Sequence, residues 1–179
     1  MNTKKKIIAA VIVFLFAGKI WANVIRVPQD YPTIQSAIKA AVAGDTVLVS
    51  PGIYHENIDF VGKDIVLGSL FLTTGDKEYL QTTVIDPDSG SAVIFVNYET
   101  RNALLCGFTI TGGTGTVIDS IRRDLVGGAG ILIRGASPVI SSVRPKSGIT
   151  YRIQAFYSEQ NFVFKRGGNL EQSPSPFVS

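Results

Sequence analysis

The chain has 179 residues, with 17 Lys or Arg against 14 Asp or Glu. Four of the lysines lie before Asn23, so the remainder carries 17 − 4 = 13 basic and 14 acidic side chains, a net charge of −1. This balance, without a basic patch interleaved with aromatics, argues against a nucleic-acid partner. Cys106 is the only cysteine, which excludes an intramolecular disulfide; it lies in an apolar run, where we expect it to be buried.

Residues 1–22 are predicted to be a signal peptide. Lys4–Lys6 give a positive start, an apolar block follows over Ile7–Gly18, and Ala22 supplies a small residue for cleavage. The block is shorter than the roughly 20 apolar residues that cross a bilayer. We therefore expect an exported protein, secreted, at the cell surface or periplasmic, with no stable membrane span after signal removal. The alternative is an anchor that stays attached.

One amphipathic helix is predicted between Pro32 and Gly44. Its apolar residues fall on one face at helical spacing: Ile34, Ile38, Ala41 and Val42. Thr33 is the expected N-cap, and Gly44 can adopt the left-handed conformation that ends a helix. A single apolar face indicates a helix that lies against a hydrophobic surface.

Short apolar runs separated by turn residues follow this helix. The runs are 45–49, 64–68, 82–86, 92–96, 104–110, 129–133 and 139–143. The second run echoes the first 19 positions later. Regular short strands fit either an antiparallel sandwich or a stack of coils. A period of about 20 residues and the absence of Asn-Gly or Asp-Gly between the runs favour the stack, with the helix covering its open end.

Six segments carry a resemblance to a known superfamily. Residues 27–38, 43–47 and 51–58 resemble the N-terminal signature of pectin-lyase-like proteins, and residues 105–113, 127–131 and 137–141 look like later coils of that superfamily. The resemblance implies an all-β fold, a right-handed parallel β-helix (solenoid) with a short N-terminal capping α-helix, over residues 23–143. It implies little about chemistry, because the superfamily includes lyases, hydrolases, esterases and non-catalytic surface proteins.

The C-terminal segment, residues 144–179, departs from this pattern. The alternation of strands and turns is expected to stop at Arg144, and a polar stretch follows. We interpret this segment as an irregular tail that results from truncation or a frameshift near Val143. The alternative is a natural polar cap over the last coil.

Few residues of the sequence suggest chemistry. His55, the only histidine, is expected to be solvated. Asp86 and Asp88 flank a proline; they could bind a cation weakly, although ordinary turn chemistry is the simpler explanation. A charge cluster is expected in an exposed loop: Asp119, Arg122, Arg123 and Asp124. Catalytic and metal-binding residues stay unassigned, and no cofactor is expected. Ca²⁺ is expected only under the alternative that the chain is part of a lyase.

Two functions fit these expectations. The first is a non-catalytic exported β-helix protein of a surface or matrix, which binds extracellular polysaccharide through aromatics such as Tyr54, Tyr79 and Tyr98, if these are more than rim residues. The second is the N-terminal fragment of a polysaccharide-modifying enzyme of the pectate lyase or pectin esterase type. A third reading is a fragment without a function of its own, because stacked repeats need about three units and a cap to be stable.

Overall fold

The computed structural model describes residues 22–117, 126–127, 130–145, 152–154, 164–166 and 169–171. Most of the regular structure is in strands, so the predicted all-β class is confirmed. Sheet A contains β1 (Val24–Val27), β2 (Thr46–Val49), β5 (Val66–Ser69), β8 (Leu104–Cys106), β13 (Val139–Ser141), β16 (Phe164–Arg166) and β17 (Asn169–Glu171) in that order. Sheet B contains β3 (Gly52–Tyr54), β6 (Thr83–Ile85), β9 (Thr109–Ile110) and β14 (Arg144–Pro145). Sheet C contains β4 (Ile58–Asp59), β7 (Val93–Phe95), β12 (Ile131–Arg134) and β15 (Arg152–Gln154).

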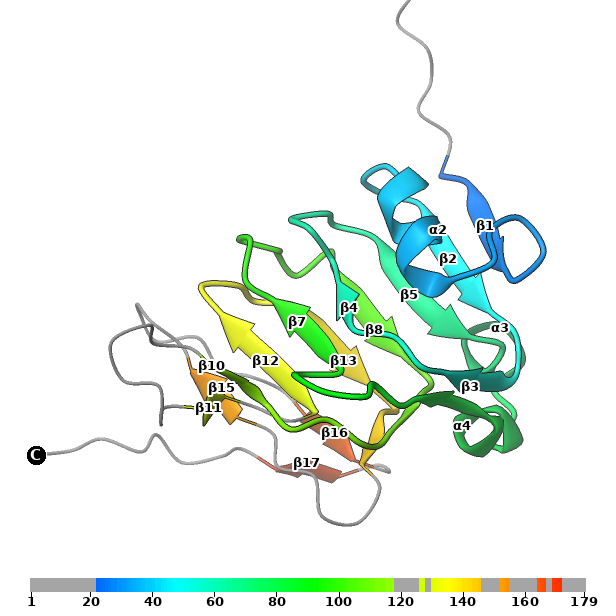
Figure 1. The fold of residues 1–179 in the computed structure, drawn as a ribbon. Helices are drawn as coiled ribbons and strands as arrows, with labels where there is room; N and C mark the ends of the chain where they lie inside the picture. The colour runs from blue at the N-terminus through cyan, green and yellow to red at the C-terminus, as the bar shows by residue number, and fades with distance from the viewer. Residues whose placement is uncertain are drawn as a thin grey trace, which may run out of the picture.

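Strand pairing within the three sheets is parallel, apart from the pair β16–β17. From β2 onward the chain passes through sheets A, B and C in turn and then returns to sheet A, so that β5 lies beside β2 and β8 beside β5 (Figure 1). The register pairs Thr46 with Val66, which is one position further along the chain than the echo in the sequence indicated. A separate antiparallel pair, β10 (Thr116–Val117) and β11 (Val126–Gly127), lies outside the three sheets.

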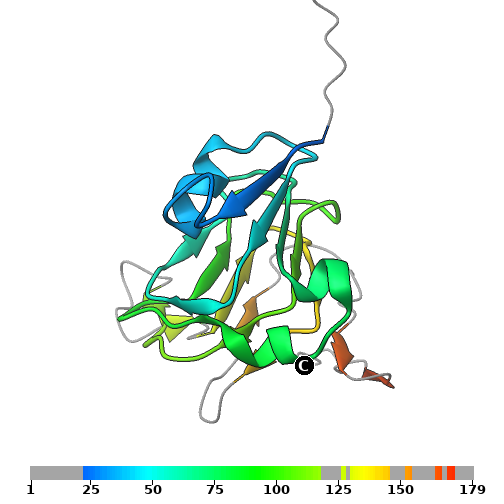
Figure 2. The same ribbon diagram turned by 90° about the vertical axis from the view of Figure 1, so that its right-hand side faces the viewer.

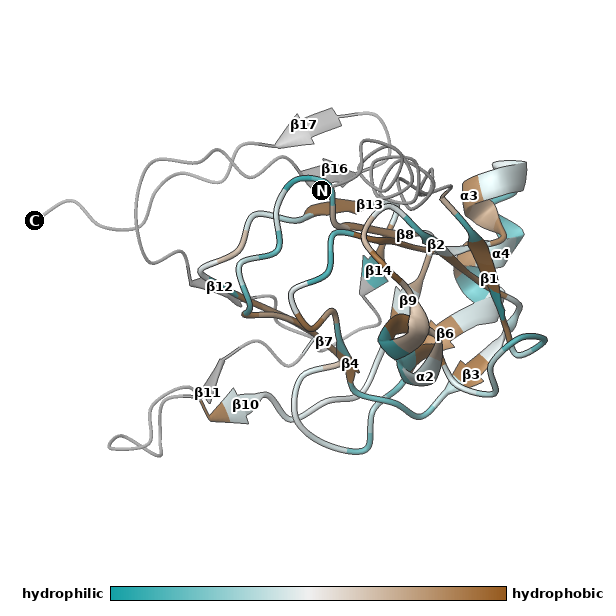
Figure 3. Ribbon diagram, turned by 90° about the horizontal axis from the view of Figure 1, so that it is seen from above, coloured by the Kyte–Doolittle hydropathy of each residue, from teal (hydrophilic) through white to brown (hydrophobic). Residues whose placement is uncertain are grey.

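The space between the sheets is filled by apolar side chains. Leu67 and Leu105 lie side by side in sheet A, and both are fully buried. The rings of Phe60 and Phe95 pack at a centroid distance of 4.3 Å with a tilt of 36°. Figure 3, viewed from above, shows apolar strands around this interior and hydrophilic connecting loops. Burial of apolar side chains, most of them aliphatic, is the dominant stabilising contribution in a chain whose only cysteine is unpaired.

Helix α2 (Ile34–Ala40) lies across the N-terminal end of the sheets (Figures 1 and 2). The predicted N-cap is confirmed, because the Thr33 hydroxyl accepts from Ser36 N at 3.1 Å. The predicted end at Gly44 is wrong, because the helix stops at Ala40, before an extended Ala41. Val42 therefore leaves the apolar face and is 54% exposed.

Two charged side chains from the next segment hold both ends of α2. The Glu56 carboxylate accepts from Ile34 N at 3.0 Å and Gln35 N at 2.9 Å, where the helix dipole favours negative charge. The Lys63 ammonium donates to the carbonyl oxygens of Ile38, Lys39 and Ala41 at 2.7–2.9 Å. These carbonyl groups have no partner within the helix, so a tertiary contact fixes its C-terminal end.

The outer edges of sheets A and C are covered at the same end. On β1, Arg26 N donates to Asp30 Oδ2 at 2.7 Å, and Arg26 O accepts from Asp30 N at 2.8 Å. On β4, the Gln35 side-chain amide donates to Asp59 O at 3.0 Å and accepts from Asp59 N at 2.7 Å. Groups that would pair with another strand are therefore occupied.

A helical insertion, which the sequence did not predict, follows β5. It contains α3 (Phe71–Thr74) and α4 (Glu78–Thr82), and it leads into β6. A Cβ atom on Gly68 would lie 2.7 Å from a Leu72 methyl group, so the insertion packs closely on β5. The run 82–86 belongs to sheet B and not to sheet A, because from β2 to β13 each strand of sheet A is followed by one of sheet B, as β2 is by β3.

Short strands are also described beyond Val143, in the segment for which the sequence predicted irregular structure. These strands are β14–β17, and β14, β15 and β16 extend sheets B, C and A respectively. The boundary at Val143 stays a prediction. The proposed signal peptide lies outside the described residues except for Ala22. None of the helices in the described ranges has the length and apolar character to cross a bilayer.

Candidate functional site

The connections from sheet C to sheet A form one side of the molecule, which we call the C–A corner. It comprises residues 60–65, 96–103 and 135–138, which join β4 to β5, β7 to β8 and β12 to β13. Because the strands on both sides are in parallel register, these connections lie in successive layers. Residues at equivalent positions of the corner are therefore presented in a row.

Left-handed backbone recurs in each layer of the C–A corner. The φ angles are +48° at Val61, +64° at Tyr98 and +66° at Gly135. Glycine adopts this region without a steric penalty, whereas β-branched and bulky residues are outliers there, at a cost of about 1–3 kcal/mol. The third layer meets the requirement with glycine, and the first has Gly62 at +72° directly after Val61. Val61 and Tyr98 retain side chains despite the strain.

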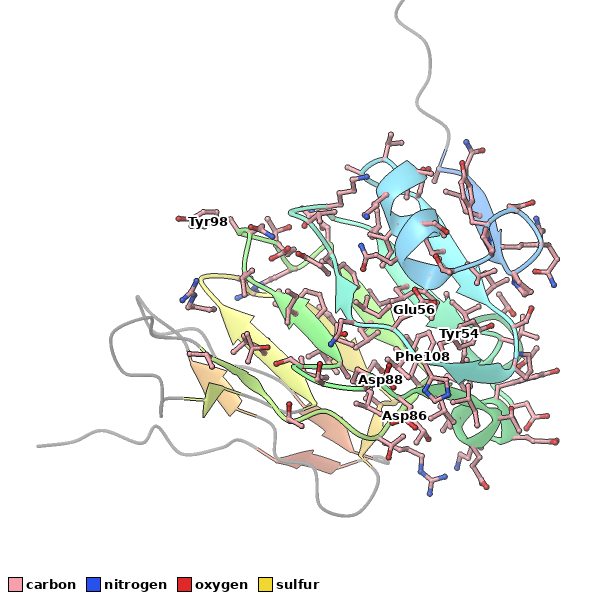
Figure 4. All side chains as sticks on the ribbon, in the orientation of Figure 1. Tyr54, Glu56, Asp86, Asp88, Tyr98 and Phe108 are labelled. Atoms are coloured by element: carbon pink, nitrogen blue, oxygen red, sulfur yellow. The ribbon has the colours of Figure 1, made fainter. Side chains whose placement is uncertain are left out.

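The side chain of Tyr98 projects from the corner into solvent. It is 83% exposed, and Figure 4 shows it at the edge of the molecule, pointing away from the strands. A Cβ atom on Gly135 would lie 3.9 Å from Tyr98 Cε1, so the ring passes beside the glycine of the next layer. The ring is therefore available for stacking with a ligand.

Two carboxylates hold the first two layers of the corner next to Tyr98. Glu99 is 1% exposed, and its carboxylate accepts from Gly62 N at 2.9 Å and Asn97 N at 3.0 Å. Asp59 Oδ1 accepts from Val61 N at 2.7 Å and from Asn97 Nδ2 at 3.4 Å. Hydrogen bonds to charged acceptors are the stronger kind, so they can maintain a strained turn. The corner is a rigid support for one exposed ring, with an amide and a carboxylate beside it.

The arrangement suits a ligand with both apolar and hydroxylated faces. An aromatic ring face attracts polarised C–H groups, and the amide of Asn97 and the carboxylate of Asp59 can exchange hydrogen bonds with hydroxyl groups. Asn97 is exposed and Asp59 is half-buried, so both side chains are accessible to solvent at the same corner. Sugar rings have this combination of surfaces.

The other two predicted tyrosines do not join Tyr98. Tyr54 is half-buried and packs against the hydrophobic core, and its hydroxyl donates to Ser50 O at 2.8 Å. Burial, with a smaller contribution from the Glu56 carboxylate, raises the pKa of Tyr54. Tyr79 is half-buried on α4. Figure 4 shows Tyr54 on the opposite side of the molecule from Tyr98, so the three tyrosines form no common platform.

Asp86 and Asp88 lie in the connection between sheets B and C. Asp88 is exposed, and Asp86 is half-buried beside Gly112, where a Cβ atom would overlap Asp86 Oδ1. The exposed His55 ring contacts Asp86 O through Nδ1 at 3.0 Å. No group of three or more His, Cys, Asp or Glu side chains in the described ranges is arranged to hold a metal ion. The cation-binding role of this pair stays a prediction.

The remaining candidates divide into two groups. Cys106 is 6% exposed, as predicted, and burial raises the pKa of its thiol. The charge cluster lies outside the described residues: Asp119, Arg122, Arg123 and Asp124. Sequence reasoning missed the roles of Asp59, Asn97 and Glu99, because nothing in their spacing indicates that they meet at one corner.

No protein-family model matches the chain, and neither the curated proteins nor the solved structures contain a match.

Proposed function

We propose that the chain is an exported, non-catalytic protein of a cell surface or extracellular matrix that binds extended polysaccharide at the C–A corner. We further propose that its sheets form a right-handed parallel β-helix of the pectin-lyase-like type. The strand order supports this, since the chain returns to sheet A after each passage through sheets B and C. The hand follows from the rule that parallel crossover connections are almost always right-handed.

The exposed ring of Tyr98, held by a strained backbone, is the observation that carries the binding proposal. A left-handed turn that needed only to change direction would be served best by glycine, as at Gly135. Retention of tyrosine at 83% exposure indicates that the side chain acts on something outside the protein. Single ring–sugar contacts are weak, so we expect retention to depend on the many binding positions that a long polymer presents to each protein molecule.

The test is retention by polysaccharide in affinity gel electrophoresis. The wild-type mature chain is run through gels that contain plant, fungal or bacterial polysaccharides, beside Tyr98→Ala and the control Tyr31→Ala. Tyr31 is another exposed tyrosine, in the loop between β1 and α2. We expect retention of wild-type and Tyr31→Ala on at least one polymer and its loss in Tyr98→Ala. No retention of the wild-type chain by any polymer, or equal retention of all three proteins, would contradict the proposal.

A polysaccharide-modifying enzyme, of which this chain is an N-terminal part, is the second candidate. The observation that favours it is the meeting of His55 with the loop that carries Asp86 and the exposed Asp88. Two carboxylates in one loop can contribute to a Ca²⁺ site when further oxygen ligands are supplied by the substrate. Release of unsaturated product from polygalacturonate with Ca²⁺, lost in Asp86→Asn, would establish this function. If the chain releases neither unsaturated product from polygalacturonate nor methanol from pectin, this function is removed for the chain.

A further inference from the structure

The backbone nitrogen of Asn23 lies against a buried carboxylate. Asn23 N donates to Asp45 Oδ1 at 2.8 Å, and Asn23 O accepts from Thr46 N at 2.8 Å. The second carboxylate oxygen, Asp45 Oδ2, accepts from Val42 N at 2.8 Å. Asp45 therefore joins the residue before β1 to the segment that follows α2.

Asp45 is buried without a positive partner among the described residues. The side chain is 3% exposed, and within the described ranges its carboxylate accepts only the two backbone N–H groups. A buried carboxylate without a cation is costly, because hydrogen bonds from neutral donors replace only part of its hydration. This position would gain from a positive charge, and the nitrogen of Asn23 is already in hydrogen-bonding contact with it.

Cleavage of the signal peptide would supply that charge. The predicted cleavage follows Ala22, so Asn23 is the first residue of the mature chain. Hydrolysis by a signal peptidase adds one water molecule across the Ala22–Asn23 peptide bond. The carboxylate remains on Ala22, and the nitrogen of Asn23 becomes an α-ammonium group that retains the released proton. An amide N–H at 2.8 Å from Asp45 is thereby replaced by a cation at the same place.

We propose that the α-ammonium group of Asn23, formed by signal cleavage, makes an ion pair with Asp45 and fixes the start of β1 to the end of α2. Processing then stabilises the mature fold relative to the precursor. This inference rests on the export part of the proposed function and is independent of polysaccharide binding. The bond from Asn23 N to the carboxylate is already charge-assisted, so the ammonium adds only the Coulomb attraction of an ion pair. For a partly exposed pair this is at most about 1 kcal/mol, which corresponds to about fivefold in the folding equilibrium constant.

The first experiment compares two first residues in the presence and absence of Asp45. A mature chain that begins at Asn23 is compared with one that begins at Ala22, in which the nitrogen of Asn23 is again an amide. Each is prepared as wild type, as Asp45→Asn and as the exposed control Asp88→Asn. In urea unfolding, we expect Asp45→Asn to lower the folding equilibrium constant of both chains. The factor should be about five times larger for the chain that begins at Asn23 than for the chain that begins at Ala22. Equal losses in the two chains would overturn the inference.

The second experiment needs no substitution, so it decides the matter even if Asp45→Asn does not fold. The folded chains are treated with an amine-acylating reagent, and the N-terminal peptide is followed by mass spectrometry. The α-amine of the Asn23 chain is expected to react about fivefold more slowly than that of the Ala22 chain, because the paired ammonium must first separate. Equal rates would refute the ion pair. N-terminal sequencing of exported protein that starts elsewhere than Asn23 would refute the processing step, whatever the result of polysaccharide binding.

Discussion

Replacement of Tyr98 by glycine and by alanine tests the strain at the C–A corner directly. At φ = +64° alanine keeps the left-handed penalty, about 1–2 kcal/mol, and glycine removes it. Glycine carries an entropic cost of about 0.5–1 kcal/mol relative to alanine. The difference, about 0–1.5 kcal/mol, predicts that Tyr98→Gly is more stable than Tyr98→Ala by about 0.75 kcal/mol, the reverse of the usual order.

The wild-type residue provides the reference for both variants. Tyr98 is 83% exposed, so the buried remainder of its side chain is about one sixth of the roughly 150–250 Å² of a buried aromatic, or roughly 35 Å². At about 25 cal/mol per Å² this contributes less than about 1 kcal/mol. Tyr98→Gly should therefore have a stability within about 1 kcal/mol of wild type, whereas both variants lose retention by polysaccharide.

Urea unfolding followed by circular dichroism measures the order of the two variants. The matched control is Lys39, an exposed residue of α2 with ordinary helical backbone, where alanine should be more stable than glycine by about 1 kcal/mol. The same order at Tyr98 as at Lys39 would refute the strained turn. A loss in both Tyr98 variants as large as that caused by removing a buried aromatic ring, about 3–5 kcal/mol, would show that the ring supports the fold.

Three further changes have expected outcomes. The Thr83 hydroxyl is buried and has no hydrogen-bond partner among the described residues, so Thr83→Val should raise the free energy of unfolding by about 1 kcal/mol. Thr116→Val, whose hydroxyl accepts from Ser91 N, should lower it, and equal effects would refute the assignment. Glu56→Ala should lower the free energy of unfolding by about 1–2 kcal/mol through loss of two bonds at the start of α2, and a cost no larger than that of the exposed Glu78→Ala would contradict this role. Burial raises the pKa of Cys106, so its contribution to stability is complete below the pKa of the unfolded thiol and decreases as pH rises through the folded pKa. Labelling with a chromogenic disulfide should follow the rate of unfolding, and rapid labelling of the folded chain would refute this.

Local signals in the sequence were sufficient for the helix start and for the main strands. Thr33 and the apolar spacing of Ile34 and Ile38 act within one turn, and the structure confirms them. The helix end could not be predicted in this way, because its carbonyl groups are held by Lys63, which lies in the next segment of the chain. Gly44 has the left-handed φ of +91° that the prediction required, but it serves the turn into β2.

The sequence located the long apolar runs but did not show where one run divides into two strands. The run 104–110 was read as one strand, but Gly107 at φ = +88° separates β8 from β9 and directs them into different sheets. The short helices α3 and α4 have few residues, and their N-cap residues, Leu70 and Lys77, provide no capping side chain, so no sequence pattern marked them. Of the candidate site, the sequence indicated only Tyr98, as one of three tyrosines, since the left-handed backbone and its carboxylates are consequences of packing between layers.

The covered edges of β1 and β4 give the three sheets a direction of growth. The Asp30 loop and the Gln35 amide occupy the hydrogen-bonding groups that another strand would need, and sheet B offers only the short strand β3 at that end. Lengthening of the sheets, whether by duplication of a stretch of the gene or by docking of another chain, must therefore take place away from β1 and β4. A row of exposed side chains at the C–A corner can be extended in that one direction only, so new ligand contacts would be added beyond Gly135 and not before Val61.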